Sequence, residues 1–201
     1  IRDLGGTLLV NRVSRLVVDP ERFPDDAAEQ MARVGQGAVY TRTTDGEPLR
    51  AIDVQERSRL MARWYEPYHA VLADLVAAML DVFGACLVID AHSFATVPLP
   101  SEGDQEPDRP DVCLGTDPFH TPRQLVEALE AALVAEGFRV AVDRPFTGAL
   151  VPLRWLPASS GLPAPGRARS PSGATVRRQC AVDRRLLERH RDVLNSLGTH
   201  R

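Results

Sequence analysis

The segment Asp90-Ala91-His92-Ser93 brings together a carboxylate, an imidazole and a hydroxyl at the end of an apolar run. If extended backbone continues through these residues, Asp90 and His92 lie on the same face of a strand. An imidazole beside a carboxylate is a common arrangement of a metal ligand and the group that supports it. The segment is therefore a candidate metal site. The alternative, that His92 only hydrogen-bonds to the backbone of a loop, stays open on spacing alone.

The elements around this segment alternate between strand and helix patterns. Apolar residues recur at steps of three and four through a long helical region that Pro67 is expected to break or kink. Short apolar or β-branched runs predict strands. The expected strands cover 7–11, 85–90, 111–115 and 138–143, and the expected helices cover 51–83 and 121–136. This order predicts an α/β fold, with a sheet covered by helices on both faces.

The strand at 85–90 is apolar throughout, which is typical of a central strand buried on both faces. In open α/β sheets, ligands bind beyond the carboxyl ends of the strands, and Asp90, His92 and Ser93 lie at such an end. The chain of 201 residues is long enough for one domain, 1–201. Residues 156–180 are rich in Pro, Ser, Gly and Arg and are expected to form a flexible loop. An amphipathic pattern over 182–198 predicts a terminal helix.

The bulk composition excludes several classes of protein. The net charge of −3 gives no basic field for nucleic acid. No apolar run approaches the roughly 20 residues that cross a bilayer, and the first residues lack the pattern of a signal peptide. Three widely spaced cysteines argue against a disulfide framework and against a paired-cysteine metal knuckle. These features favour a cytoplasmic protein, and they leave its oligomeric state open.

Six segments follow one another in an order that carries a family resemblance. They are VSRLVVDPERFPDD (13–26), GAVYTRTTDGEPLR (37–50), YEPYH (65–69), DAHSF (90–94), PDVCLGTDPFHTP (110–122) and DRPFTGALVP (143–152). Together they resemble the N-formylglutamate amidohydrolase family over about residues 7–153. The resemblance implies a three-layer sandwich with a mixed, mostly parallel central sheet, similar to the zinc-dependent exopeptidases. It also implies hydrolysis of N-formyl-L-glutamate to formate and glutamate, late in histidine degradation.

The resemblance assigns roles around the opening segment. His92 matches the metal-binding histidine of the family, and the expected cofactor is zinc or another divalent metal. Asp90 and Ser93 are the catalytic-site candidates beside it. Asp90 would orient the imidazole. Ser93 more readily bonds to the loop backbone than acts as a nucleophile, because no His-Asp pairing supports a serine triad.

The small acidic substrate is a dianion, so its pocket should offer fixed positive charges. Arg15, Arg42 and Arg144 lie in segments that match the family pattern and are the substrate-binding candidates, ahead of Arg22 and Arg50. Arginine can grip a carboxylate with two parallel hydrogen bonds. The alternative for each is an ion pair with a neighbour such as Asp19 or Glu21. Possible wall residues are Tyr40, Tyr65 and His69, although a packed and hydrogen-bonded role is favoured for His69.

Two departures from the family pattern bear on activity. The family carries an upstream HSG strand end and a following acidic residue as further metal ligands, and this sequence contains no HSG. We therefore expect the N-terminal segment of the family to be missing here. Ala181, in AVDRRLL, stands where the family's EVNRRLY has the glutamate of the general base. Two alternatives to the deformylase follow: a catalytically silent relative that binds small acidic ligands, and an amidase or peptidase for another N-acyl amino acid.

Overall fold

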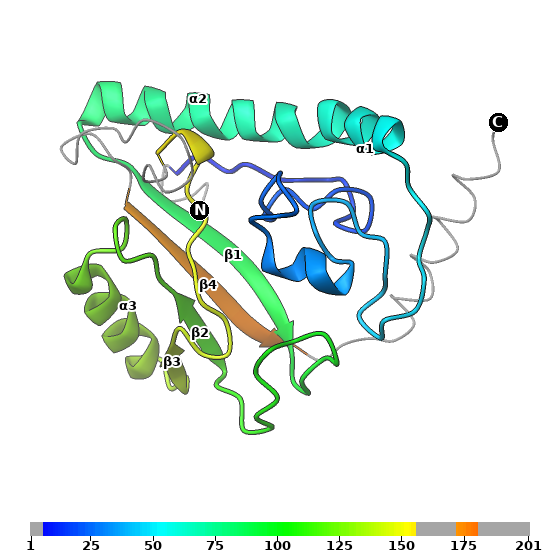
Figure 1. Cartoon of the computed structure of the whole chain (residues 1–201). Helices are drawn as coiled ribbons and strands as arrows, with labels where there is room; N and C mark the ends of the chain where they lie inside the picture. Colours follow the sequence, from blue (N-terminus) through cyan, green and yellow to red (C-terminus); the bar gives the residue numbers. More distant parts are fainter. Residues whose placement is uncertain (1–5, 156–171, 181–201) are drawn as a thin grey trace.

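The computed structural model describes residues 6–155 and 172–180 of the chain, and residues 1–5, 156–171 and 181–201 lie outside that description. Its main elements are three α-helices and four strands, accompanied by short 3-10 helices at Gln30–Val34 and Leu153–Trp155 and a π turn at Met61–Tyr65 (Figure 1). The helices are α1 (Val54–Leu60), α2 (Glu66–Phe83) and α3 (Arg123–Ala135). The strands are β1 (Leu87–Ala95), β2 (Val112–Gly115), β3 (Val140–Val142) and β4 (Ser172–Cys180). The prediction of a mixed α/β fold is confirmed, whereas the terminal helix expected over 182–198 lies outside the described residues.

The four strands form one mixed sheet in the order β1-β4-β2-β3. β1 pairs with β4 in parallel, β2 pairs with β3 in parallel, and β2 meets β4 antiparallel. β4 is therefore an interior strand, with Ala91 of β1 opposite Val176 and His92 opposite Arg177. The expectation of a flexible loop over 156–180 is wrong for residues 172–180. Backbone pairing on both sides overrides a composition that lacks the usual apolar residues of a strand.

The helical region divides into two α-helices just before Pro67, in keeping with the expected break or kink. A single π-helical turn, Met61–Tyr65, joins α1 to α2, and Pro67 lies in the first turn of α2. Proline has no N–H to donate to the preceding turn, and a wider turn just before it accommodates that loss. Gly84 ends α2 in the left-handed conformation, with its amide donating to the carbonyl of Leu80 at 2.8 Å.

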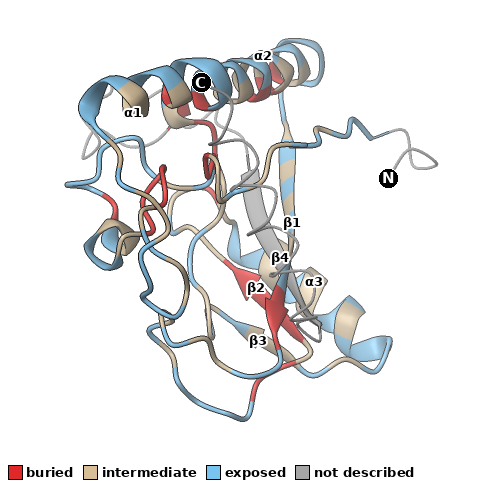
Figure 2. Cartoon of the chain, turned by 90° about the vertical axis from the view of Figure 1, so that its right-hand side faces the viewer, coloured by how far each residue is buried: buried red, intermediate tan, exposed pale blue. Residues whose placement is uncertain are grey.

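Two clusters of buried side chains form the core of the described part. The first joins the loops before α1 to the π turn, through Val18, Ala38, Val39, Met61 and Tyr65. The second packs α2 against the segment after β3, through Leu72, Val76, Leu80, Val151 and Trp155. Figures 1 and 2 show the strands lying between α2 and α3, with buried residues in β2, on the inner side of the long helix and in the loops before α1.

β1 differs from the buried central strand that its apolar sequence predicts. Leu87 and Ile89 are about half exposed, and exposed and partly buried residues alternate until Phe94 and Ala95. β1 is an edge strand among the described strands, which accounts for the alternation. The strand expected at 7–11 is also wrong, because these residues have no regular structure. No helix in the described ranges has both the length and the apolar character needed to cross a bilayer.

Candidate metal and substrate site

Asp90 and His92 meet on one face of β1, as their spacing predicts. Nε2 of His92 lies 2.6 Å from Oδ2 of Asp90, and each side chain is 15% exposed. The strand continues to Ala95, so its alternation places the two residues side by side. The ring is therefore fixed in orientation by the carboxylate, close to the surface at an edge of the sheet.

Glu21 joins this pair from a loop far away in the sequence. Its Oε1 lies 3.4 Å from the same Nε2 of His92, and its side chain is 31% exposed. One donor atom from each of Glu21, Asp90 and His92 falls within 4.8 Å of the others. Sequence reasoning missed Glu21 as a site residue and named it only as a possible partner of an arginine. The one available signal was its place in the family-like segment 13–26.

The electrostatics of this cluster reflect its partial burial. Burial raises the pKa of Glu21 above the usual carboxyl value, although the nearby His92 opposes that shift. Burial also raises the pKa of Tyr68 to about 12, with Asp90 and Glu21 adding to the shift. The negative charges of both carboxylates therefore disfavour ionisation of Tyr68 on α2. A carboxylate with a raised pKa in a partly closed site is typical of functional positions.

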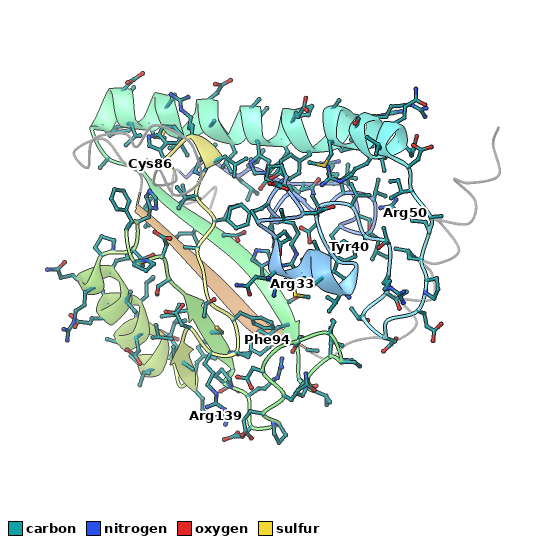
Figure 3. The ribbon with its side chains drawn as sticks, in the orientation of Figure 1. Arg33, Tyr40, Arg50, Cys86, Phe94 and Arg139 are labelled. Carbon is teal, nitrogen blue, oxygen red and sulfur yellow. The ribbon has the colours of Figure 1, made fainter. Side chains whose placement is uncertain are left out.

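The turn Asp19–Arg22 that carries Glu21 is held at Asp19. This carboxylate is fully buried, and its Oδ2 accepts hydrogen bonds from Nη2 of Arg15 at 2.6 Å and from the hydroxyl of Tyr40 at 2.8 Å. Its Oδ1 accepts from the amide of Glu21 at 3.1 Å. Figure 3 shows Tyr40 among the loops beside β1 and Phe94 near the end of that strand. Asp19 therefore ties the turn to both the arginine and the tyrosine.

The helical region holds the same turn from the other side. Nε2 of His69 donates to the carbonyl of Pro20 at 2.7 Å, and the hydroxyl of Tyr65 donates to the carbonyl of Arg22 at 2.8 Å. The rings of Tyr65 and His69 lie 4.3 Å apart between centroids, as expected for residues four apart on one helical face. Burial lowers the pKa of His69, which favours the neutral ring with one donated proton. The packed, hydrogen-bonded role expected for His69 is confirmed.

Of the three predicted substrate arginines, the structure brings only Arg15 near the cluster. Its side chain is 50% exposed, and its Nη2 lies 3.9 Å from Oε2 of Glu21. Burial disfavours its charge, but Asp19, Tyr40 and Glu21 outweigh this effect and raise its pKa overall. Its pair with Asp19 is not a simple surface ion pair, because Asp19 has no exposed side-chain surface.

The other arginines have different surroundings. Nη1 of Arg42 donates to the carbonyl of Gly46 within its own turn, at 2.7 Å. Nε of Arg144 lies 3.5 Å from a carboxylate oxygen of Asp104, in the loop after β1. Nη2 of Arg50 donates to the carbonyls of Leu16 and Val17, which makes it a structural link between loops. Arg22, the remaining candidate, lies 3.5 Å from Oδ2 of Asp19, within the site.

Ser93 and the expected general-base position complete the predicted set. Ser93 is exposed and follows His92 directly in β1, so strand alternation directs it to the opposite face from Asp90 and His92. Ala181, which stands at the expected glutamate, lies outside the described residues. The cluster therefore consists of one imidazole and two carboxylates, with the guanidinium of Arg15 beside Glu21.

Comparison with known proteins identifies the family behind this geometry. The family model described as N-formylglutamate amidohydrolase matches residues 1–166. The chain belongs to the N-formylglutamate amidohydrolase family. It is 34% identical over 158 residues to the N-formylglutamate deformylase of Pseudomonas aeruginosa, which covers 73% of this chain and 56% of that protein. It is 33% identical over 120 residues to the deformylase of Pseudomonas putida, covering 57% and 43%. The chain thus spans about half the length of these curated relatives.

Solved structures place this amidohydrolase-family chain in the same fold. A crystal structure of N-formylglutamate amidohydrolase from Ralstonia eutropha JMP134 aligns with a TM-score of 0.66 at 22% identity, over 90% of this chain and 71% of that one. A gene product from Agrobacterium tumefaciens aligns with a TM-score of 0.57 at 17% identity, over 92% and 68%. At these identities the likeness extends to the fold alone.

The donor set of the family member fits a divalent cation. Imidazole suits zinc and similar transition metals, and carboxylates bind zinc as well as harder cations. His92, Asp90 and Glu21 converge from two separate elements, and none of the three is fully buried. These residues could hold a metal while leaving one side open to a small ligand.

Proposed function

We propose that this chain is a metal-dependent amidohydrolase that converts N-formyl-L-glutamate and water to formate and L-glutamate. The convergence of Asp90 and Glu21 on one ring nitrogen of His92 is the observation that carries the proposal. Membership of the N-formylglutamate amidohydrolase family supplies the reaction class and the substrate. The fold that accompanies this proposal is a three-layer sandwich similar to the zinc-dependent exopeptidases. The reaction belongs to histidine degradation in the cytoplasm.

The cofactor of this proposal is zinc, with His92 as its ligand and Asp90 as the group that orients the imidazole. A bound divalent cation would polarise the formyl carbonyl and lower the pKa of a water molecule toward neutrality. In the metal-free protein, Oδ2 of Asp90 accepts a hydrogen bond from Nε2 of His92 and so fixes the plane of the ring. A partly buried carboxylate near the cation would serve to accept a proton from water.

Arg15 is the proposed anchor for a carboxylate of the substrate. Two of its nitrogens are held by Asp19, Nε at 3.1 Å and Nη2 at 2.6 Å, while half of the side chain stays exposed. A guanidinium fixed in this way loses little conformational entropy when it binds an anion. It lies beside Glu21, so an anion held there would place the rest of a small molecule toward His92.

The proposal is tested by loading the purified chain with zinc, measuring bound metal per chain, and assaying formate release. One zinc per chain with turnover of N-formyl-L-glutamate supports the deformylase. Saturable binding of glutamate-like ligands without turnover would instead identify a catalytically silent relative. Release of other acyl groups, with no activity on the formyl compound, would identify an amidase for a different N-acyl amino acid.

The role of Arg15 makes a separate prediction. Arg15→Met should raise KM for N-formyl-L-glutamate by about 10- to 100-fold, because one charge-assisted bidentate contact is lost from the substrate complex. Arg42→Met is the matched control, since Arg42 is engaged with its own turn, and its KM should stay near that of the parent chain. A larger effect from Arg42 than from Arg15 would move the anion site away from the Asp19–Arg22 turn.

A further inference from the structure

We propose that Glu21 is a direct ligand of the divalent metal, completing with His92 and Asp90 a three-residue site built from β1 and the Asp19–Arg22 turn. This inference rests on the proposed function, because it requires that the cluster at His92 holds a metal. It adds a ligand from a loop that sequence reasoning did not connect with the metal. It also gives Asp90 a second task once the metal is present.

Two carboxylates approach one ring nitrogen of His92. Nε2 of His92 lies 2.6 Å from Asp90 and 3.4 Å from Glu21. A neutral imidazole carries only one N–H, and the short contact to Asp90 uses it. Glu21 therefore approaches Nε2 with no N–H left there to donate a hydrogen bond to it. A cation in place of that proton would be coordinated by one atom from each of Glu21, Asp90 and His92.

The separation of Glu21 from His92 matches the spacing of metal ligands. Two ligand atoms at 2.0–2.1 Å from a tetrahedral zinc lie about 3.4 Å apart. The Oε1–Nε2 distance is 3.4 Å, whereas the Asp90–His92 distance of 2.6 Å is that of a hydrogen bond. Glu21 is thus already at ligand spacing. Asp90 orients the ring in the metal-free protein and shares the cation when the proton leaves Nε2.

Formal charges around the cluster also suit a doubly charged cation. Asp19, Glu21 and Asp90 each contribute a negative charge, and Arg15 contributes one positive charge that is held against Asp19. Arg22 and Glu29, which lie 3.8 Å apart, offset each other next to this group. The excess of two negative charges lies at the carboxylates nearest His92. A divalent cation would compensate them.

Glu21 is held more firmly than a residue of an ordinary surface loop. The backbone on both sides of it is bonded to helical residues, with Pro20 accepting from His69 and Arg22 accepting from Tyr65. Its own amide donates to the buried Asp19. Such support of a ligand's backbone reduces the cost of ordering it when the metal binds. The π turn ending at Tyr65 is placed directly against this segment, in keeping with the frequent occurrence of such turns near functional sites.

The test is a measurement of zinc affinity, which does not depend on activity. Equilibrium dialysis or competition with a chromophoric chelator gives the Kd of the full chain, and circular dichroism verifies folding of each variant. Glu21→Gln should weaken zinc binding by at least about 100-fold, more than the 10- to 100-fold effect typical of supporting residues. Glu21→Asp should also weaken it substantially, because the shorter side chain keeps the charge but cannot reach the same position.

A matched control separates coordination from the loss of a surface charge. Glu127→Gln removes an exposed carboxylate of α3 whose partner is Arg123, and it should leave the Kd unchanged. His92→Ala provides the reference for loss of the central ligand. If Glu21→Asp binds zinc as tightly as the parent chain, Glu21 acts only through its charge and the ligand assignment is overturned.

The remaining outcomes distinguish this inference from the proposed function. If the parent chain binds no zinc at all, both fail together at the level of the proposed function. If the parent chain binds zinc and Glu21→Gln binds it equally well, the ligand assignment alone is wrong. Unchanged zinc affinity with lost formate release would make Glu21 a proton acceptor instead, which also contradicts its assignment as a ligand.

Discussion

Arg109 carries a buried charge that is held by several partners. Its side chain is 1% exposed and pairs with Glu102, and its guanidinium also donates to the carbonyls of Ala95 and Asp104. The guanidinium carbon lies 5.9 Å from the ring centre of Phe94 and 5.7 Å from that of Phe146. One arginine therefore joins the end of β1 to the loop that follows it. The rings of Phe94 and Phe146 pack edge to face, with 5.6 Å between their centroids.

Arg109→Met should destabilise the protein by about 3–5 kcal/mol, because it leaves the partly buried Glu102 and two carbonyls without their donor. Urea unfolding followed by circular dichroism measures the change. Arg123→Met is the matched control, since its pair with Glu127 is exposed on α3, and its effect should be close to zero. Equal losses in the two variants would show that Arg109 contributes no more than a surface charge.

Glu21 offers a prediction about pH in the absence of metal. Burial raises its pKa in the folded protein above the ordinary 4.5, so the folded state resists ionisation of this group. Below pH 4.5 this group therefore takes nothing from the free energy of unfolding. As the pH rises through the pKa of Glu21 in the folded protein, the free energy of unfolding falls. Glu21→Gln should therefore raise the free energy of unfolding at pH 7, and this advantage should vanish at pH 4. The measurement is urea unfolding at both pH values with a chelator present.

The same gain at pH 4 and pH 7 would contradict this account, because a pH-independent effect cannot come from ionisation of Glu21. A loss of stability at pH 7 would contradict it as well. The stabilisation expected for Glu21→Gln at pH 7 indicates that Glu21 is present for function and not for stability. A side chain that costs stability in the metal-free protein is commonly retained for what it binds.

At the scale of elements, the site depends on loops that are fixed by few but specific contacts. The loop Gly35–Arg50 carries Tyr40, whose hydroxyl bonds to Asp19. Gly35 begins this loop with φ of +77°, and its carbonyl accepts from the amides of Thr41 and Arg42. A Cβ at Gly35 would lie 2.8 Å from Cγ of Arg42 and 2.9 Å from Oγ1 of Thr41. Both the conformation and the close approach therefore require glycine.

Gly46→Ala and Gly35→Ala form a pair that separates these two effects. Both glycines have positive φ, but a Cβ at Gly46 meets nothing within 4 Å. Gly46→Ala should cost about 1 kcal/mol for the left-handed conformation. Gly35→Ala should cost about 1–3 kcal/mol more, because neighbouring atoms must also move. Chemical denaturation of both variants tests this difference, and equal losses would remove the packing argument at Gly35.

Sequence reasoning succeeded where local patterns dominate and failed where pairing is long-range. The helical region ending at Gly84 and strands near 112–115 and 140–142 follow from periodicity and glycine signals. β4 was missed because Ser172–Cys180 has no apolar run, and its place in the sheet depends on β1 and β2. β1 was predicted too short and too buried, because sequence does not reveal which strand lies at an edge.

The candidate site divides in the same way. The pairing of Asp90 with His92 could be predicted from alternation over two residues. Glu21 could not, because its approach to His92 depends on how the Asp19–Arg22 turn is held by Tyr65 and His69. The arginines Arg15, Arg42 and Arg144 looked alike in sequence, yet only Arg15 lies beside the cluster. The family pattern identifies which segments belong to the site. Tertiary contacts determine which charged side chains of those segments lie close together.

At the scale of the whole molecule, the described chain combines the family's sheet with a carboxylate-rich site. It spans 56% of the deformylase from Pseudomonas aeruginosa, and the family model matches it through residue 166. The sheet brings β1 and its Asp90–His92 pair to an edge, and the loops before α1 supply Glu21 and Arg15 there. We therefore propose, as the central claim, that His92 and its two carboxylates hold a cation that serves amide hydrolysis.

The most direct test of that claim compares formate release by the zinc-loaded parent chain and by His92→Ala under identical conditions. We predict turnover of N-formyl-L-glutamate by the parent chain and a loss of at least about 100-fold in kcat/KM for the variant, because the imidazole is the central metal ligand. A parent chain that binds one zinc and releases no formate would contradict the account. So would a His92→Ala variant that keeps full activity.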